Sequence, residues 1–384
     1  MHADPFTSEE ILATLQSLVR TPSVNPTIAP TEPYGETAIA AVICDWLERR
    51  GIRASIEEAA PGRPNVFAEI GSRTGPSLVL CAHLDTVGTA GMTIPPFEPC
   101  IENGKVFGRG SYDMKGSVAA ILAAAAALSH ENNLRGRVLL ALVADEEDAS
   151  LGARDFVRRH SADAAILTEP SEGRLILAHK GFVWLELTTR GRAAHGSRWD
   201  LGVSAIAKMA RVIESLERFD RETLRRRDHP LVGPASQHCA LIEGGSGLST
   251  YAEKCVLRVE RRTLPGETPE QVLAETEAVV RRSGTEAEIR LLLDRPPLVS
   301  DSHSPIARAV REAATTVVGH PPEETGVAYW MDAAIFAAAG VPTVNYGPAG
   351  AGAHEAVEWV ELDSVISCAK VLAESAHRFF AAVA

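Results

Sequence analysis

The spacing of apolar residues along the first 180 positions predicts short strands that alternate with helices. Apolar runs with the length of buried strands occur at 65–70, 78–82, 138–144 and 164–167. Apolar residues at helical spacing occur at 8–18, 36–50, 117–129 and 151–160. Strands separated by helices predict an α/β fold with a mainly parallel, doubly wound sheet.

The pattern changes after residue 180. Strands are predicted at 182–189, 239–243, 255–261 and 288–293, with helices at 202–218 and 269–282. This order is typical of a small α+β sandwich of the split βαβ (ferredoxin-like) kind. The α/β pattern then resumes with a helix at 305–318, a strand at 341–344 and a helix at 363–382. We therefore predict a discontinuous domain, 1–180 plus 295–384, interrupted by an inserted domain at 181–294.

Composition and charge narrow the possible classes of function. The chain is 45% hydrophobic and 23% charged, which is typical of a globular protein. Its net charge of −12 argues against nucleic acid or an anionic membrane as a partner, because both require a basic surface. The six cysteines form no closely spaced pair, no apolar run approaches 18 residues, and the first residues do not resemble a signal peptide. We expect a soluble, cytoplasmic protein.

Polar side chains follow three of the predicted strands directly. His83 and Asp85 end the strand at 78–82, four consecutive acids begin at residue 145 after the next strand, and Glu169 follows the strand at 164–167. Each cluster taken alone could equally belong to an ordinary turn or a solvated surface loop. In open α/β sheets, however, ligands bind beyond the carboxyl ends of the strands, so we expect these groups to lie close together.

Two glycine-rich loops add an aspartate and a second histidine. Asp113 lies in the loop 108–116 before the helix at 117–129, where a helix N-cap is the alternative role, and His354 ends the loop 347–354. Histidine and carboxylate ligands without thiolates suit zinc or a similar ion. Two such ions bring a charge of +4, of which Asp113, Glu147 and Glu169 would cancel 3.

These residues resemble the motifs of a known family, the co-catalytic zinc amidohydrolases and exopeptidases. The family includes acetylornithine deacetylase, succinyl-diaminopimelate desuccinylase, aminoacylase and carboxypeptidase G. The matching motifs, in chain order, are His83-Leu84-Asp85, Gly110-Ser111-Tyr112-Asp113-Met114-Lys115-Gly116, Asp145-Glu146-Glu147, Thr168-Glu169-Pro170 and Gly352-Ala353-His354. Further similarity lies at 178–181 and 262–268.

The resemblance implies a metal centre with two divalent ions, in the first place Zn²⁺, with Co²⁺ or Mn²⁺ as alternatives. Asp113 would bridge the two ions. His83 and Glu169 would complete one site, and Glu147 and His354 the other.

The resemblance also implies the remaining roles. Glu146 matches the general base that takes a proton from a metal-activated water, and Asp85 matches the carboxylate behind the first histidine ligand. The inserted domain matches a lid and dimerisation domain. In it, His195 matches a histidine that stabilises the oxyanion in a partner subunit's active site, and Arg262 matches an arginine that pairs with a substrate carboxylate.

The inserted domain departs from the family pattern in three places. An Asn-x-Ile-Pro element is replaced by the segment from Ser249 to Ala252, a proline after His195 is replaced by Trp199, and a helix asparagine by Ser204. These positions bear on substrate contacts and not on the metal ligands, so the resemblance does not name a substrate.

The leading hypothesis is a metal-dependent hydrolase that removes the acyl group from N-acyl amino acids, as an acetylornithine deacetylase or a succinyl-diaminopimelate desuccinylase does. A dipeptidase or carboxypeptidase with the same two metals is the alternative, and a catalytically silent metal-binding homologue is a third. The expected partners are a small N-acyl amino acid or short peptide and a second copy of the chain. The acyl group, the amino acid and the physiological metal are not determined by these patterns.

Overall fold

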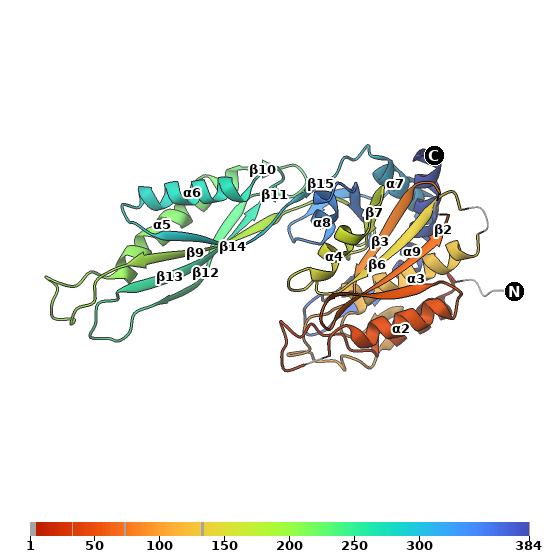
Figure 1. Cartoon of the computed structure of the whole chain (residues 1–384), viewed down its shortest axis with the longest axis horizontal. Coiled ribbons are helices and arrows are strands. Elements are labelled where there is room, and N and C mark those ends of the chain that lie inside the picture. Colours follow the sequence, from red (N-terminus) through yellow and green to blue (C-terminus); the bar gives the residue numbers. More distant parts are fainter. Residues whose placement is uncertain (1–4, 33, 73, 132–133, 384) are drawn as a thin grey trace. The chain divides into compact units, whose positions relative to one another are not determined.

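The structure, a computed structural model, describes residues 5–32, 34–72, 74–131 and 134–383. The chain divides into two units (Figure 1). Unit 1 comprises Met1–Leu177, Ser300–Thr325 and Met331–Ala384, and unit 2 comprises Ala178–Val299 and Gly326–Trp330. The assignment of a catalytic domain and of a lid and dimerisation domain to parts of the chain stays a prediction.

Unit 1 is built on a mixed sheet with a parallel centre. In spatial order, its strands are β1 (Ala54–Ala60), β2 (Arg63–Gly71), β6 (Arg137–Val143), β3 (Ser77–His83), β7 (Ala164–Leu167), β17 (Thr343–Asn345) and β8 (Leu175–His179). Strands β6, β3, β7 and β17 are parallel, whereas β1, β2 and β8 join antiparallel. Every residue of β3 is buried, as expected for a strand covered on both faces. Strand β8 also pairs with two short strands, β15 (Leu298–Val299) and β16 (Glu324–Val327), whose residues belong wholly or partly to unit 2. The predicted α/β fold is confirmed.

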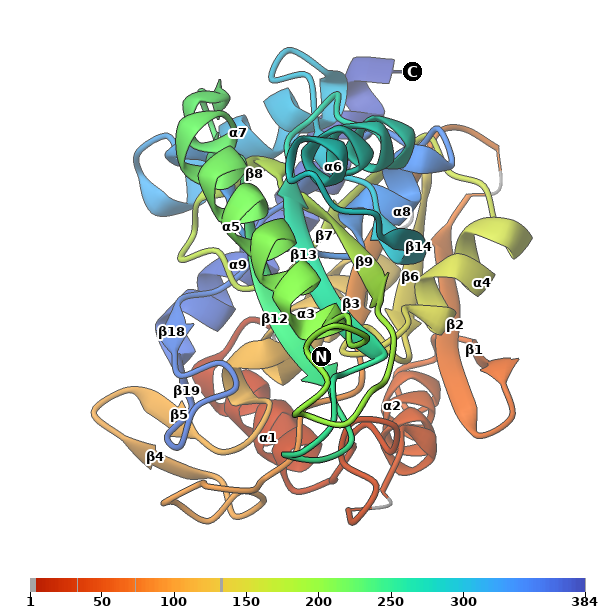
Figure 2. The same cartoon turned by 90° about the vertical axis from the view of Figure 1, so that its left-hand side faces the viewer.

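Helices cover both faces of this sheet. The helices of unit 1 are α1 (Ser8–Val19), α2 (Thr37–Glu48), α3 (Gly116–Ser129), α4 (Leu151–Arg159), α7 (Pro305–Val318), α8 (Ala333–Ala338) and α9 (Leu362–Val383). Helices α3 and α9 lie on one face, and α4 and α8 on the other (Figures 1 and 2). Helix α3 is apolar and buried on nearly all sides, because it packs between the sheet and the helices α1 and α9. Each helix in the described part of the chain is too short or too polar to span a lipid bilayer.

A second, four-stranded sheet of unit 1 was not predicted from the sequence. Its order is β18 (Gly350–Ala351), β19 (Trp359–Glu361), β5 (Lys105–Phe107) and β4 (Cys100–Glu102). The turn between β4 and β5 is Asn103-Gly104, with φ of 51° and 76°. This dipeptide is a strong hairpin signal, and it could have identified β4 and β5. Strand β19 has no such signal, because its partner β5 is more than 250 residues away in the sequence.

Unit 2 has the predicted split βαβ topology. It contains β9 (Gly181–Arg190), α5 (Ala205–Glu222), β12 (Ser236–Gly244), β13 (Lys254–Thr263), α6 (Pro269–Arg282) and β14 (Glu288–Arg295), together with a short helical turn η2 (Leu224–Arg226) and the strand pair β10 (Asp228–His229) and β11 (Gly233–Pro234). The antiparallel order β12-β13-β9-β14 is that of a ferredoxin-like sheet, which confirms the predicted fold. Helices α5 and α6 lie side by side on one face (Figure 2).

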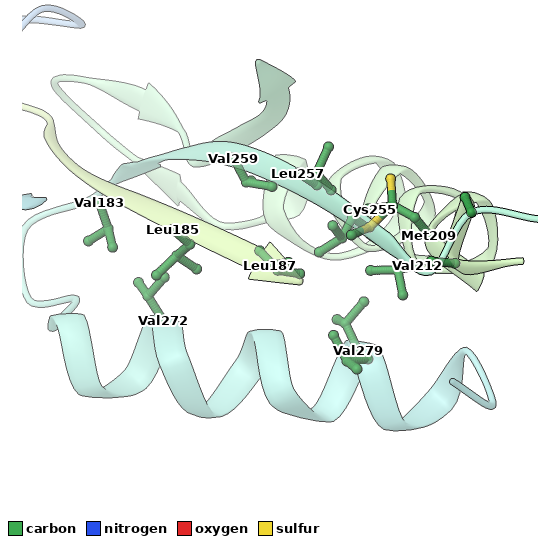
Figure 3. Close-up of a cluster of buried hydrophobic side chains, with 14 residues drawn as sticks. Val183, Leu185, Leu187, Met209, Val212, Cys255, Leu257, Val259, Val272 and Val279 are labelled. Atoms are coloured by element: carbon green, nitrogen blue, oxygen red, sulfur yellow. The ribbon is translucent and has the colours of Figure 1, made fainter. Parts of the chain in front are cut away.

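The core of unit 2 lies between its sheet and these two helices. Alternate residues of β9 and β13 point into it, and α5 and α6 close it from the other side (Figure 3). Two departures from the family pattern contribute to this packing. Ala252 is buried in the cluster, and the Ser204 hydroxyl caps α5 by accepting a hydrogen bond of 3.1 Å from the amide of Ala207.

Candidate metal centre

Parallel strands bring three ligand-bearing loops to one edge of the large sheet. Strand β3 is parallel to β6 on one side and to β7 on the other. The strands end at His83, Val143 and Leu167, so the residues that follow them leave the sheet at the same edge. His83, Glu147 and Glu169 therefore meet although they come from three separate parts of the sequence.

Asp113 lies between two histidine rings. Its Oδ1 is 3.0 Å from Nε2 of His83, and its Oδ2 is 3.2 Å from Nε2 of His354. The His354 Nε2 is also 3.1 Å from Glu147 Oε2, and the His83 Nε2 is 3.8 Å from Glu169 Oε1. A carboxylate that presents one oxygen to each of two imidazoles has the arrangement required to bridge two cations.

The four-stranded sheet positions the two remaining proposed ligands, Asp113 and His354. Asp113 lies in the helical turn η1 (Ser111–Lys115), which follows β5, and His354 lies in the turn between β18 and β19. That turn requires Gly352, whose φ is +85° and at which an added Cβ would lie 1.9 Å from the carbonyl oxygen of Val357. This steric conflict explains why the family motif Gly352-Ala353-His354 begins with glycine.

The donor atoms fall into two groups that share one histidine. One group contains His83, Asp113 and Glu147, the other His83, Glu146 and Glu169, and within each group the atoms lie within 4.8 Å of one another. Imidazole nitrogen and carboxylate oxygen without thiolate is a ligand set for zinc or a similar divalent ion. With His354, whose Nε2 contacts both Asp113 and Glu147, the residues present supply two histidines and three carboxylates and fit a centre for two metal ions.

Crowding of buried carboxylates strongly changes their pKa values. Burial raises the pKa of Glu169 to about 8 and that of Glu146 well above its usual range, and at Glu146 the charge of Glu169 adds to the effect. At Asp113 burial acts in the same direction, but hydrogen bonds from His354 and His83 outweigh it and lower the pKa. Hydrogen bonds to Asp113 and Glu147 raise the pKa of His354 to about 10. The site favours bound positive charge, whether protons or cations.

Asp85 connects His83 with the loop that carries the two glutamates. Its carbonyl oxygen accepts a hydrogen bond of 2.9 Å from Nδ1 of His83, which leaves Nε2 to face Asp113. Its carboxylate is farther from the ring, at 3.7 Å, and accepts hydrogen bonds of 3.1 Å from the backbone amides of Glu146 and Glu147. The carboxylate of Asp85 is therefore more closely bonded to the glutamate loop than to the histidine.

A buried polar network behind Asp85 was not predicted from the sequence. The Nδ2 of Asn25 donates hydrogen bonds to Asp85, at 2.8 Å, and to Asp145, at 3.0 Å. Arg63 lies 2.7 Å from Asp145 and donates to both carboxylate oxygens of Glu36. No pattern marks Asn25, because it lies in a proline-rich link and its partners are 60 and 120 residues away.

Unit 2 carries two predicted site residues, the exposed His195 and the partly exposed Arg262. His195 is exposed, and its Nδ1 accepts a hydrogen bond of 3.3 Å from the amide of Ser197. The segment of His195 pairs with the segment from Ser249 to Ala252, which departs from the family pattern. The amide of Gly196 donates to the carbonyl of Ser249 at 2.7 Å. Arg262 packs over the ring of Phe182 at 5.2 Å, and its Nε donates to Glu260 at 2.7 Å.

Comparison with known proteins identifies the family. Residues 79–378 match the profile of peptidase family M20/M25/M40. The chain belongs to this family. It is 33% identical to the acetylornithine deacetylase of Proteus mirabilis in an alignment of 277 residues, which covers 69% of this chain and 71% of that protein. It is 26% identical to a probable succinyl-diaminopimelate desuccinylase of Staphylococcus epidermidis over 374 residues, which covers 88% of this chain and 91% of that protein.

The solved structures confirm that this chain has the M20 fold. The aminopeptidase PepT from Bacillus cereus superposes with a TM-score of 0.81 at 19% identity, and the match covers 98% of this chain and 99% of that one. The protein is thus an M20 metallohydrolase, as the sequence motifs predicted. Its relatives include both deacylases and peptidases, so membership of the family leaves the substrate open.

Proposed function

We propose that this M20 enzyme hydrolyses the amide bond of N-acyl amino acids and releases a carboxylate and an amine. The observation that carries the proposal is the position of Asp113 between the Nε2 atoms of His83 and His354, at 3.0 and 3.2 Å. The preference for a deacylase rests on the 33% identity to an acetylornithine deacetylase and on the match to a desuccinylase over most of the chain.

The metal centre in this proposal contains two divalent ions, Zn²⁺ in the first place and Co²⁺ or Mn²⁺ as alternatives. His83 and Glu169 would hold one ion, Glu147 and His354 the other, and Asp113 would bridge them; the support is that these side chains converge within hydrogen-bonding distance or close to it. When bound, such ions polarise the amide carbonyl and lower the pKa of water to about 7.

Glu146 is the proposed proton carrier. Its carboxyl group is close to His83 and Glu169, and its backbone is held by the carboxylate of Asp85. In this role it takes a proton from the attacking water and donates it to the nitrogen of the leaving amine.

Two residues of unit 2 complete the proposal. The Nδ1 of His195 accepts a hydrogen bond from Ser197, so that a neutral ring carries its proton on Nε2 and can donate it to an oxyanion in a partner subunit's site. Arg262 uses Nε for Glu260, and no partner for its two terminal nitrogens is found among the described residues. That fork can bind a substrate carboxylate in a bidentate way. The homodimer that His195 requires stays a prediction.

The role of Glu146 is tested by the variant Glu146→Gln. We expect turnover to fall by a factor on the order of 10² to 10⁴, the usual contribution of a general base, with the metal content unchanged. The matched control is Asp148→Asn, which removes an exposed carboxylate from the same loop and should keep wild-type turnover. Full activity of Glu146→Gln would exclude the assignment.

A substrate panel separates the candidate reactions. N-acetyl-ornithine, other N-acyl amino acids, dipeptides and peptides with a C-terminal glutamate are each assayed with added zinc or cobalt. Cleavage of N-acyl amino acids supports the deacylase, and exclusive cleavage of peptides supports the dipeptidase or carboxypeptidase. A metal-loaded protein that cleaves none of them would instead be the catalytically silent homologue.

A further inference from the structure

A buried ion pair joins loops that carry three of the proposed metal ligands. The side chains of Arg109 and Glu358 are exposed by only 2% and 0% of their surface. The Arg109 Nη1 lies 2.7 Å from Glu358 Oε2. Neither residue belongs to the proposed ligands, and neither is used in the proposed reaction.

Glu358 binds the loop of Asp113 through four N–H groups. Its Oε2 accepts hydrogen bonds from Arg109 Nη1, at 2.7 Å, and from the amide of Gly110, at 2.9 Å. Its Oε1 accepts from the amides of Tyr112, at 3.0 Å, and Asp113, at 2.9 Å. One carboxylate therefore fixes the backbone on both sides of the residue proposed to bridge the metals.

Arg109 connects the other two ligand-bearing segments. Its Nε donates to the carbonyl of Gly88, at 3.1 Å, in the segment that follows His83. Its Nη2 donates to the carbonyl of Glu355, at 3.1 Å, which directly follows His354. The guanidinium group thus bonds to the carbonyl directly after His354 and to a carbonyl five residues after His83, while its ion pair holds the loop of Asp113.

We propose that Arg109 and Glu358 are positioning residues that set the spacing of His83, Asp113 and His354 before metal binds. The proposal rests on the metal centre proposed above. The two side chains act through the backbone of the ligand loops and touch no reacting atom. Groups outside the ligand sphere that orient ligands commonly contribute a factor of 10 to 100 in metal affinity.

The chemistry of Glu358 requires a carboxylate and not merely a polar side chain. Glutamine of the same size has one acceptor oxygen, and its NH₂ group would face two N–H donors of the loop. In the variant Glu358→Gln, two buried donors would therefore lose their acceptor, and the guanidinium of Arg109 would lose its charge partner. The loop of Asp113 is then expected to relax away from the two histidines.

The test is a titration of metal-free protein with Co²⁺, followed by calorimetry and by the visible spectrum, which reports the ligand geometry. We expect the wild type to bind two ions, and Glu358→Gln to bind 10 to 100 times more weakly with an altered spectrum. The control is Glu361→Gln, which removes the same charge from an exposed side chain of β19 and should bind as the wild type does.

The possible outcomes separate this proposal from the one on which it rests. If the wild type binds no Co²⁺, the metal centre itself is wrong. If the wild type binds Co²⁺ and a folded Glu358→Gln binds it with the same affinity and spectrum, the positioning role is wrong. If circular dichroism shows that Glu358→Gln does not fold, Arg109→Lys decides, since it keeps the charge opposite Glu358 but loses the fork to Gly88 and Glu355. At least tenfold weaker binding supports the proposal, and unchanged binding overturns it.

Discussion

Glu36 lies in the buried network behind the candidate metal centre, and its charge depends on pH close to neutrality. Burial raises the pKa of Glu36 from 4.5 to about 7, against the opposing hydrogen bond from Arg63. Below pH 4.5 the folded and unfolded states are both protonated at this residue. Between pH 4.5 and 7 the folded state holds a proton that the unfolded state has lost, so folding stability falls as pH rises.

The raised pKa of Glu36 predicts that the difference in unfolding free energy between the wild type and Glu36→Gln depends on pH. Relative to the variant, the wild type should lose about 3 kcal/mol of unfolding free energy between pH 4.5 and pH 7.5, since one pKa unit corresponds to about 1.4 kcal/mol. Denaturant unfolding of both proteins across this range measures the difference. A constant difference at all pH values would contradict the raised pKa.

At the scale of elements, the four-stranded sheet matters more to the site than its size suggests. Strand β5 leads into the loop of Asp113, and the turn between β18 and β19 carries His354. Two glycines of this sheet have positive φ, but their surroundings differ. Gly104, at +76°, has no atom within 4 Å of an added Cβ, whereas at Gly352, at +85°, the carbonyl oxygen of Val357 is 1.9 Å away.

The pair Gly104→Ala and Gly352→Ala separates backbone strain from steric conflict. We expect Gly104→Ala to cost about 1 kcal/mol, the typical penalty of the left-handed conformation for alanine, and to leave Co²⁺ binding unchanged. Gly352→Ala should cost more and should weaken Co²⁺ binding, because the turn must move to remove the conflict. Denaturation and metal titration measure both effects. Equal behaviour of the two variants would contradict the steric role of Gly352.

At the scale of the whole molecule, the two units have separate cores, and only unit 1 contains the proposed ligands of the metal centre. An ion that binds only the folded state stabilises it by about 2.7 kcal/mol at a concentration 100 times its dissociation constant. Removal of metal with a chelator should therefore destabilise unit 1 and leave the core between β9, β13, α5 and α6 unaffected.

Hydrogen exchange followed by mass spectrometry tests this prediction strand by strand. After chelation, the amides of β3 and β6 should exchange faster, and those of β13 should not change. The variant Asp113→Ala serves as the control, since its exchange should not respond to the chelator. Faster exchange in β13 of the wild type would show that the metal stabilises both units together.

The sequence by itself determined the central strands and most helices of the two folds, the family and the set of proposed ligands. This was possible because helices and strands leave a periodic apolar pattern, and because residues directly after buried parallel strands must share one edge of the sheet. His83, Glu147 and Glu169 belong to this class. Asp113 and His354 were found because they lie in glycine-rich motifs. At Gly352 the structure shows why glycine is required, since an added Cβ would collide with the carbonyl oxygen of Val357.

Only the tertiary structure decided how these ligands are held. The bonds from Asn25 to Asp85 and Asp145 join residues 60 and 120 positions apart, and the bond from Arg109 to Glu358 joins residues 249 positions apart. Such contacts leave no local pattern, because one buried polar side chain in a loop resembles any other polar residue in the sequence. A buried carboxylate must nevertheless be paired, and the folded chain alone determines which distant donor pairs with it.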